Sequence, residues 1–345
     1  MLFRREGLAR DTGPPPAAAP PHMSPNELSR SQRVTDRLGI TVDPSMGTGP
    51  AGDRALVEHL RRAHANGITR FDLAAARSPG RAVSLLRTAF PAPSPEITVL
   101  LGRTEREPAP AAPAGRSTPS LARTPVVPVV PGALRSVRDS LPPQARVLLE
   151  VPPWSTGTTG IPERVAALHR RVTDHELDGW SLRATREQDL PPAEVGSEPV
   201  PHFSIELSLL EGARAASISA SVDGRSVSVF VRNPFASGRL DGSRIAEGLS
   251  DRRPRAGPTR LPELQAEFAP VLALGFLTEH RGRTLAQAAV QYLLTKPWVE
   301  TVFLPALPPE RQAQFLDLDR LRPLTPEEID RIESGAVAPG DTDPF

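Results

Sequence analysis

Short apolar runs alternate along the chain with longer stretches in which apolar residues recur at helical spacing. Segments of strand length lie at residues 38–42, 68–74, 97–101, 147–151, 179–182, 203–209, 227–231 and 299–304. Helical spacing is clearest at residues 53–66, 81–90, 133–141, 163–172, 261–277, 285–294 and 309–316, and the Thr-Pro-Glu-Glu capping pattern at 325–328 predicts one more short helix. Eight strands separated by helices, with no G-x-G-x-x-G motif after the first, favour a closed (β/α)8 TIM barrel over an open doubly wound sheet.

Segments rich in Pro and Ala flank and interrupt the predicted barrel. Residues 1–30 show little apolar periodicity, so we expect a disordered tail there. The barrel is expected at residues 31–335 and a C-terminal tail at 336–345. A Pro-rich insert near residues 103–131 replaces a compact βα connection and predicts either a lid or a disordered insert at the rim. Because the insert contains no aromatic residue, we favour a flexible rim.

Charge and composition exclude several classes of function. The 345 residues carry 41 Lys+Arg against 40 Asp+Glu, and this net charge of +1 gives no electrostatic basis for a nucleic-acid partner. The chain has no cysteine, which excludes disulfides, thiolate nucleophiles, iron–sulfur clusters and cysteine-based zinc sites. No apolar run approaches the roughly 18 residues of a membrane span, so we expect a cytoplasmic protein.

Rare residue types limit the chemistry that the chain offers. The one tyrosine is Tyr292 and the one lysine is Lys296, on or just after the predicted helix at 285–294. Because the helices of such a barrel cover its outside, we expect packing roles for both residues. His59 and His64 lie five positions apart on one predicted helix, which does not suit a pair of metal ligands, so no metal site is predicted.

Polar residues follow several of the predicted strands. They are Asp72, Glu150, Ser181 and Arg232. In a (β/α)8 barrel the carboxyl ends of the strands meet at one mouth, where catalytic residues are found. This mouth is therefore the candidate site.

Several segments carry recognisable motifs in a fixed order. They are Ala-Asn-Gly-Ile-Thr-Arg-Phe-Asp-Leu-Ala at 65–74, Asn-Pro-Phe-Ala-Ser-Gly-Arg-Leu at 233–240, the helix and strand at 283–304, and the patterns at 309–310 and 324–329. In this order they resemble the aldo-keto reductases, with gaps, from about residue 34 to residue 332. The resemblance implies a TIM barrel of the aldo-keto reductase type, in which a nicotinamide hydride reduces a carbonyl group.

The resemblance also implies a catalytic set that this chain mostly lacks. In the family a tyrosine donates the proton, a lysine and an aspartate tune it, and a histidine orients the substrate. The tyrosine position is Arg77 here, and the histidine position is Glu150. The lysine position falls at Leu101 or Gly102, and only the aspartate, Asp72, is kept. Because arginine is a poor acid, we expect that nicotinamide-dependent carbonyl reduction has been lost.

The positions that the resemblance assigns to the cofactor are changed as well. The aromatic that stacks on the nicotinamide falls at Arg232, and of the Ser-Asn pair that holds the nicotinamide amide only Ser181 remains. The segment that lines the pyrophosphate keeps Ser237 and Gly238. Apolar residues replace those that hold the adenosine phosphate, and only Arg311 compensates in part. We therefore expect no cofactor or, at most, weak NADP(H) binding.

Asp72, Arg77 and Glu150 are expected to converge at the mouth, with a guanidinium between two carboxylates. They form either a structural ion pair or a catalytic acid/base pair in which apolar neighbours raise the pKa of Glu150. Trp154, shortly after Glu150, is expected to line a substrate pocket.

Three functions remain open. We favour a cofactor-independent acid/base enzyme of bacterial specialised metabolism, namely a lyase, dehydratase, cyclase or isomerase, in which Asp72 and Glu150 transfer protons and Arg77 or Arg232 binds a carboxylate or enolate. The first alternative is a non-catalytic pseudoenzyme that binds a metabolite or a protein partner. The second is an atypical NADPH-dependent oxidoreductase that takes its proton from water or Glu150. The expected partner is a small-molecule metabolite, with neither nucleic acid nor membrane involved.

Overall fold

The computed structural model describes residues 33–42, 49–73, 79–91, 97–102, 138–141, 144–151, 161–184, 194–195, 198–199, 202–222, 228–243, 260–279 and 282–334. Within these residues, eight parallel strands close into a barrel in the order β1-β10-β9-β8-β5-β4-β3-β2. Their bounds are β1 Leu38–Thr41, β2 Arg70–Asp72, β3 Thr98–Gly102, β4 Arg146–Val151, β5 Gly179–Ala184, β8 His202–Glu206, β9 Ser228–Arg232 and β10 Val299–Leu304. The short strands β6 (Glu194–Val195) and β7 (Glu198–Pro199) form a separate antiparallel pair. The predicted (β/α)8 barrel is confirmed.

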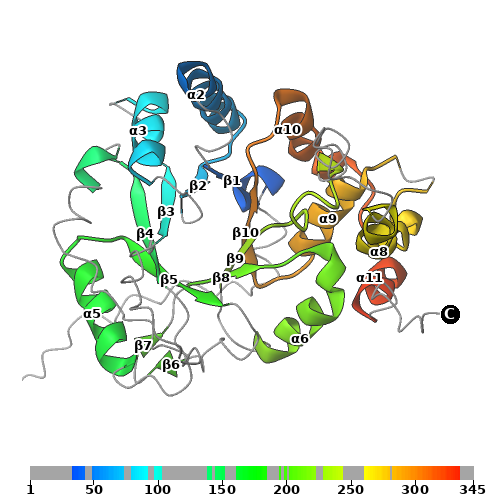
Figure 1. The fold of residues 1–345 in the computed structure, drawn as a ribbon. Coiled ribbons are helices and arrows are strands. Elements are labelled where there is room, and N and C mark those ends of the chain that lie inside the picture. The colour runs from blue at the N-terminus through cyan, green and yellow to red at the C-terminus, as the bar shows by residue number, and fades with distance from the viewer. Residues whose placement is uncertain are drawn as a thin grey trace, which may run out of the picture. The chain divides into compact units, whose positions relative to one another are not determined.

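Helices surround the strands (Figure 1). They are α2 Gly49–Ala65, α3 Pro79–Ala89, α5 Ile161–Thr173, α6 Gly212–Val222, α8 Arg260–Leu272, α9 Leu285–Leu294, α10 Pro309–Leu316 and α11 Pro326–Glu333, with 3₁₀ turns at Val34–Arg37, Leu209–Glu211, Gly275–Leu277 and Leu318–Arg320. The sequence pattern misses α6, because most of its residues are Ala, Ser and Gly and its buried stripe is short. Most of the predicted helix at 133–141, and both predicted tails and the rim insert, lie outside the described residues.

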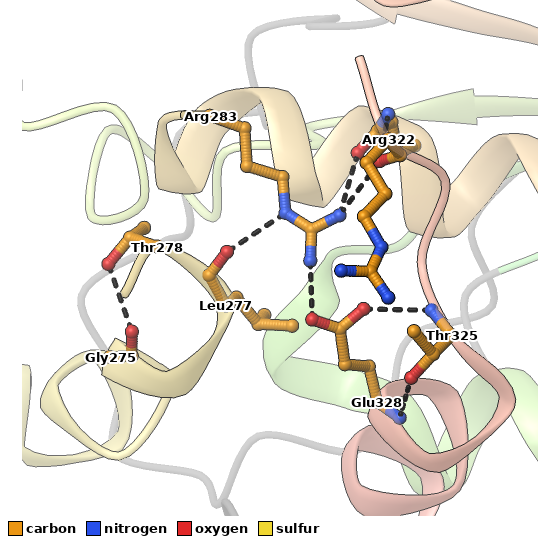
Figure 2. Close-up of polar contacts among 8 residues, drawn as sticks. Gly275, Leu277, Thr278, Arg283, Arg322, Thr325 and Glu328 are labelled. Atoms are coloured by element: carbon orange, nitrogen blue, oxygen red, sulfur yellow. Dashed lines mark hydrogen bonds and ion pairs between the residues drawn. The ribbon is translucent and has the colours of Figure 1, made fainter. Parts of the chain in front are cut away.

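The C-terminal helices are joined by one buried arginine (Figure 2). Arg283 donates from Nε to the carbonyl oxygen of Leu277 at 2.9 Å and from Nη1 to that of Arg322 at 3.2 Å. Its Nη2 lies 2.6 Å from Oε1 of Glu328. The other oxygen of Glu328 accepts from the backbone N–H of Thr325 in the predicted capping box of α11. A single carboxylate therefore connects the start of α11 to the residue that precedes the capping residue of α9.

Side chains of the strands alternate between the helices and the barrel interior. The ring of Phe71 in β2 packs against that of Phe90 after α3, with ring centroids 5.3 Å apart. Trp180 of β5 and His169 of α5 pack edge to face, with ring centroids 5.9 Å apart. These positions point outward. Inside the barrel lies a separate apolar cluster made of Leu100, Leu148, Phe230 and Phe303. Residues two positions beyond this cluster on their strands therefore point into the barrel at its C-terminal end.

Charged residues close the N-terminal end of the interior. Glu300 Oε1 lies 3.1 Å from Arg70 Nη2, and Glu300 Oε2 lies 3.2 Å from His202 Nδ1. The His202 ring stacks on Phe230 with centroids 5.0 Å apart. Burial raises the pKa of Glu300, but His202 and Arg70 lower it more, so the net pKa is below the ordinary value. Contacts at this end of a TIM barrel serve stability.

Candidate active site

Asp72, Glu150 and Arg232 meet inside the barrel at the C-terminal ends of β2, β4 and β9. The Arg232 guanidinium donates from Nε and Nη2 to Oδ2 and Oδ1 of Asp72 at 2.6 and 3.0 Å. Its Nη1 donates to Oε1 of Glu150. The side chains are 0%, 2% and 8% exposed for Asp72, Glu150 and Arg232 respectively. The mouth of the barrel therefore holds a buried, charge-assisted ion network with a fork geometry toward Asp72.

Among the described residues, the guanidinium that lies between Asp72 and Glu150 is that of Arg232, in the role that the sequence predicts for Arg77. Arg77 lies outside the described residues, and so does Trp154. The resemblance assigns Arg232 to the nicotinamide, but its side chain is directed to the two carboxylates instead. The reason is geometric, because Arg232 lies two residues beyond Phe230, whose ring belongs to the interior cluster. Two carboxylates buried side by side are strongly destabilising without a cation, and Arg232 pairs with both of them.

Glu150 has two further partners that the sequence pattern does not identify. Ser204 of β8 donates from Oγ to Oε1 of Glu150, and Arg183 of β5 donates from Nη2 to Oε2 at 2.7 Å. Both residues have the inward-pointing parity of their strands. A polar residue inside an otherwise apolar strand, as at Ser204 between Phe203 and Ile205, is the signal that could have identified it.

The electrostatics of the network keep Glu150 ionised. Burial raises the pKa of the Glu150 carboxyl. The charges and hydrogen bonds of Arg232 and Arg183 lower this pKa by more than burial raises it, so the net pKa lies below the ordinary value. The expectation that the net pKa of Glu150 lies above its ordinary value is therefore wrong. Burial lowers the pKa of Arg232, but Asp72 and Glu150 more than reverse this effect, so its net pKa is raised.

Of the positions assigned to the cofactor, Ser237 and Gly238 are bonded within their own loop, whereas Ser181 is not bonded through its side chain to a described residue. Ser181 is fully buried in β5, and its Oγ has no hydrogen-bond partner among the described residues. In the loop after β9, the N–H of Ser237 donates to Oδ1 of Asn233 at 2.7 Å, and the N–H of Gly238 donates to the carbonyl oxygen of Phe235 at 3.1 Å. Ser237 and Gly238 adopt left-handed backbone angles, with φ of 58° and 89°. The two amides that could face a phosphate are thus already bonded.

Arg311, the basic residue expected to compensate at the adenosine end, is also engaged. Its Nη2 donates to the carbonyl oxygen of Asp241 at 2.7 Å and lies 2.8 Å from Oδ2 of the same residue. The other carboxylate oxygen of Asp241 accepts from the N–H of Ser243 at 3.0 Å. Phe315 of α10 packs against Phe235 with ring centroids 5.5 Å apart. These contacts fasten the loop after β9 to α10.

Tyr292 and Lys296 lie at the outside of the barrel, as the sequence predicts. The Tyr292 hydroxyl on α9 lies 3.3 Å from Oε1 of Glu333 on α11, and the Lys296 ammonium pairs with the same oxygen. Burial raises the pKa of Tyr292, and the Glu333 charge raises it further. Neither residue reaches the mouth.

Two features are absent from the part of the chain that the structure describes. Among these residues, no group of three or more His, Asp and Glu side chains is placed to hold a metal ion. In the same ranges, no helix combines the length and the apolar character needed to cross a membrane.

The chemistry available at the mouth follows from these contacts. The Glu150 oxygens accept from three donors, and the Asp72 carboxylate forms a bidentate pair with Arg232. An ionised carboxylate has no proton to donate, and the bonds that lower the pKa of Glu150 also make it a weak base. The arrangement is therefore suited to holding charge in place.

Comparisons with known proteins bear on the fold. No protein-family model matches the chain, and no curated protein sequence does. Among solved structures, the glycerol dehydrogenase AKR11B4 from Gluconobacter oxydans matches with a TM-score of 0.62 and 18% identity, over 90% of this chain and 94% of that chain. The holo form of the aldo-keto reductase AKR11C1 from Bacillus halodurans matches with a TM-score of 0.59 and 19% identity, over 87% and 91%.

A variant of Gox0644 in complex with NADPH matches with a TM-score of 0.54 and 15% identity, over 87% of this chain and 89% of that chain. At these identities the likeness concerns the fold alone. The chain therefore has the (β/α)8 barrel fold of the aldo-keto reductases.

Proposed function

We propose that this chain is a member of the aldo-keto reductase superfamily that has lost nicotinamide-dependent carbonyl reduction and binds a small metabolite at the barrel mouth without transforming it. The position of Arg232 carries the proposal. Its guanidinium is buried at the mouth between Asp72 and Glu150. Carbonyl reduction of the family's kind needs a nicotinamide held at the mouth, and at the position that the resemblance gives to the stacking aromatic the chain places a permanently charged guanidinium.

Three observations argue against a productive NADP(H) site. The side chain of Arg232, at the position of the stacking aromatic, is held by two carboxylates. The amides of Ser237 and Gly238 are bonded within their own loop. Arg311 is paired with Asp241. The residues present do not fit the cofactor that the fold family implies, and we assign it no step.

The same contacts weigh against the acid/base enzyme that the sequence alone favours. A residue that moves protons works best when its pKa lies near the working pH. The two guanidiniums lower the pKa of Glu150 despite its burial, and both of its oxygens accept hydrogen bonds. The carboxylate is thus held as a structural anion, which favours binding over proton transfer.

Titration of the purified chain with NADPH tests the proposal. Binding is followed by quenching of tryptophan emission and by energy transfer to the reduced nicotinamide, and consumption of NADPH is followed with a panel of aldehydes and ketones. We expect no saturable signal up to millimolar NADPH and no consumption.

Saturation in the micromolar range that is lost in Gly238→Asp, but kept in Gly80→Asp, would overturn the proposal. Gly238 lies in the loop that lines the pyrophosphate in the family, whereas Gly80 is an exposed residue of α3 and provides a matched control.

A further inference from the structure

Two oppositely charged side chains remain open at the mouth, Arg183 of β5 and Glu206 of β8. These strands are neighbours in the barrel (Figure 1). Arg183 is 41% exposed and uses one nitrogen, Nη2, to bond Glu150. Glu206 is exposed at the last position of β8, and its carboxylate makes no hydrogen bond or ion pair with a described residue. One cation and one anion are thus available to a ligand.

Strand register places both side chains at the same end of the interior. Arg183 is paired with Ser204, so Glu206 lies two residues farther along the neighbouring strand. Ser204 bonds Glu150 inside the barrel, and Glu206 shares its parity on β8. Arg183 is directed down to Glu150, and no ion pair joins it to Glu206. The two side chains therefore lie on adjacent strands, two positions apart in register, and do not pair with each other.

The charge balance of the described mouth residues favours a ligand that carries a positive group. The carboxylates of Asp72 and Glu150 are matched by the guanidiniums of Arg232 and Arg183. Glu206 adds one negative charge that nothing in this set compensates. A ligand with only negative charge would be repelled by Glu206, whereas an ammonium group would be attracted.

We propose that the mouth binds a small zwitterion of the amino-acid type, with its carboxylate on the open edge of Arg183 and its ammonium group on Glu206. This inference rests on the proposed function and names the class of its ligand. A guanidinium presents its donors in a planar fork that suits a carboxylate. The amine then completes the charge balance at Glu206, and Glu150 holds Arg183 in position from below.

Isothermal titration of the purified chain with defined probes tests the inference. The probes are glycine, β-alanine and 4-aminobutyrate as zwitterions, propionate as a carboxylate alone, and propylamine as an amine alone. At least one zwitterion should bind about tenfold or more tightly than propionate and propylamine, because a hydrogen bond to a charged group is worth about a tenfold change or more.

Variants separate the two contacts. Glu206→Gln should lower the affinity for the zwitterion about tenfold, to that for propionate. Arg183→Met should remove binding of both the zwitterion and propionate. Glu163→Gln, an exposed acidic residue in the first turn of α5, should change nothing and serves as the matched control.

Equal affinity for propionate and the zwitterions, or an unchanged affinity in Glu206→Gln, would overturn the zwitterion class while leaving metabolite binding intact. Absence of binding by any zwitterion up to about 100 mM, a concentration that would saturate a site with a Kd of about 1 mM, would overturn it too. Micromolar binding of NADPH would instead show that the proposed function itself has failed.

Discussion

Replacing Arg232 with methionine should destabilise the barrel strongly. The substitution leaves Asp72 and Glu150, which are 0% and 2% exposed, without the cation between them. Removing one partner of a buried ion pair costs about 3–5 kcal/mol, and Arg232 bonds two carboxylates, so we expect a loss at the upper end of that range. The unfolding free energy of a domain is only about 5–15 kcal/mol. Urea unfolding followed by far-ultraviolet circular dichroism measures the loss.

Arg183→Met is the matched control for this prediction. It also removes a guanidinium from Glu150, but the Arg183 side chain is 41% exposed. Glu150 keeps its bonds to Arg232 and Ser204 in this variant, so we expect a loss of about 1.5–3 kcal/mol, below that of Arg232→Met. If the Arg232→Met variant does not fold well enough to be purified, Arg232→Lys replaces it in the test. Lysine keeps the positive charge but not the planar guanidinium, so we expect its loss of unfolding free energy to be smaller than that of Arg232→Met. Equal losses in Arg183→Met and Arg232→Met would refute the view that the buried cation organises the mouth.

Three further predictions concern stability. Because its folded pKa is lowered, ionised Glu150 stabilises the fold above the ordinary glutamate pKa, and this contribution is lost as pH falls through the folded value. The gap in urea midpoint between the parent chain and Glu150→Gln should therefore close in acid, and a constant gap would contradict the lowered pKa. Gly212→Ala should lose about 1–3 kcal/mol in thermal unfolding, because the new Cβ would lie 2.2 Å from the carbonyl oxygen of Ile332. Gly80→Ala is the control, because a new Cβ there has no atom within 4 Å, and it should gain up to about 1 kcal/mol of stability. Similar effects of the two substitutions would mean that the close approach to Ile332 does not limit the residue at position 212. Glu300→Gln at the barrel floor should lose about 1 kcal/mol or less and leave ligand binding at the mouth unchanged, as titration calorimetry would detect.

Much of the barrel is predictable because local signals agree with the fold. The sequence places helices at 285–294 and 309–316 and a strand at 299–304, and these are the bounds of α9, α10 and β10. The segments of α9 and β10 have strong apolar runs, and Thr284 caps α9 while Pro309 opens α10. The sequence pattern does not predict α6, because its Ala and Ser residues give a weak periodic signal. This helix is stabilised by packing against its neighbours.

The candidate site is predictable only in part. Asp72 and Glu150 stand out because each follows an apolar strand, and the structure brings them together through Arg232. The partners of these residues depend on strands far apart in the sequence: Arg232 lies 160 positions from Asp72 and 82 from Glu150. No local pattern reveals which cation fills that space. The pKa of Glu150 is mispredicted for the same reason, since Arg183 also approaches from another strand.

The retained aspartate and the new arginine are physically coupled. The resemblance implies that in the family a lysine at the end of the third strand lies beside the aspartate. This chain has Leu101 and Gly102 at the end of β3. Asp72 is nevertheless fully buried, and a buried carboxylate without a cation is strongly destabilising. In this chain the cation comes from β9, as Arg232, at the position of the stacking aromatic. The residue at the position that the resemblance gives to the nicotinamide contact is thus the one that pairs with the buried Asp72, and this pairing supports the fold in a chain for which we propose that the reduction chemistry is lost.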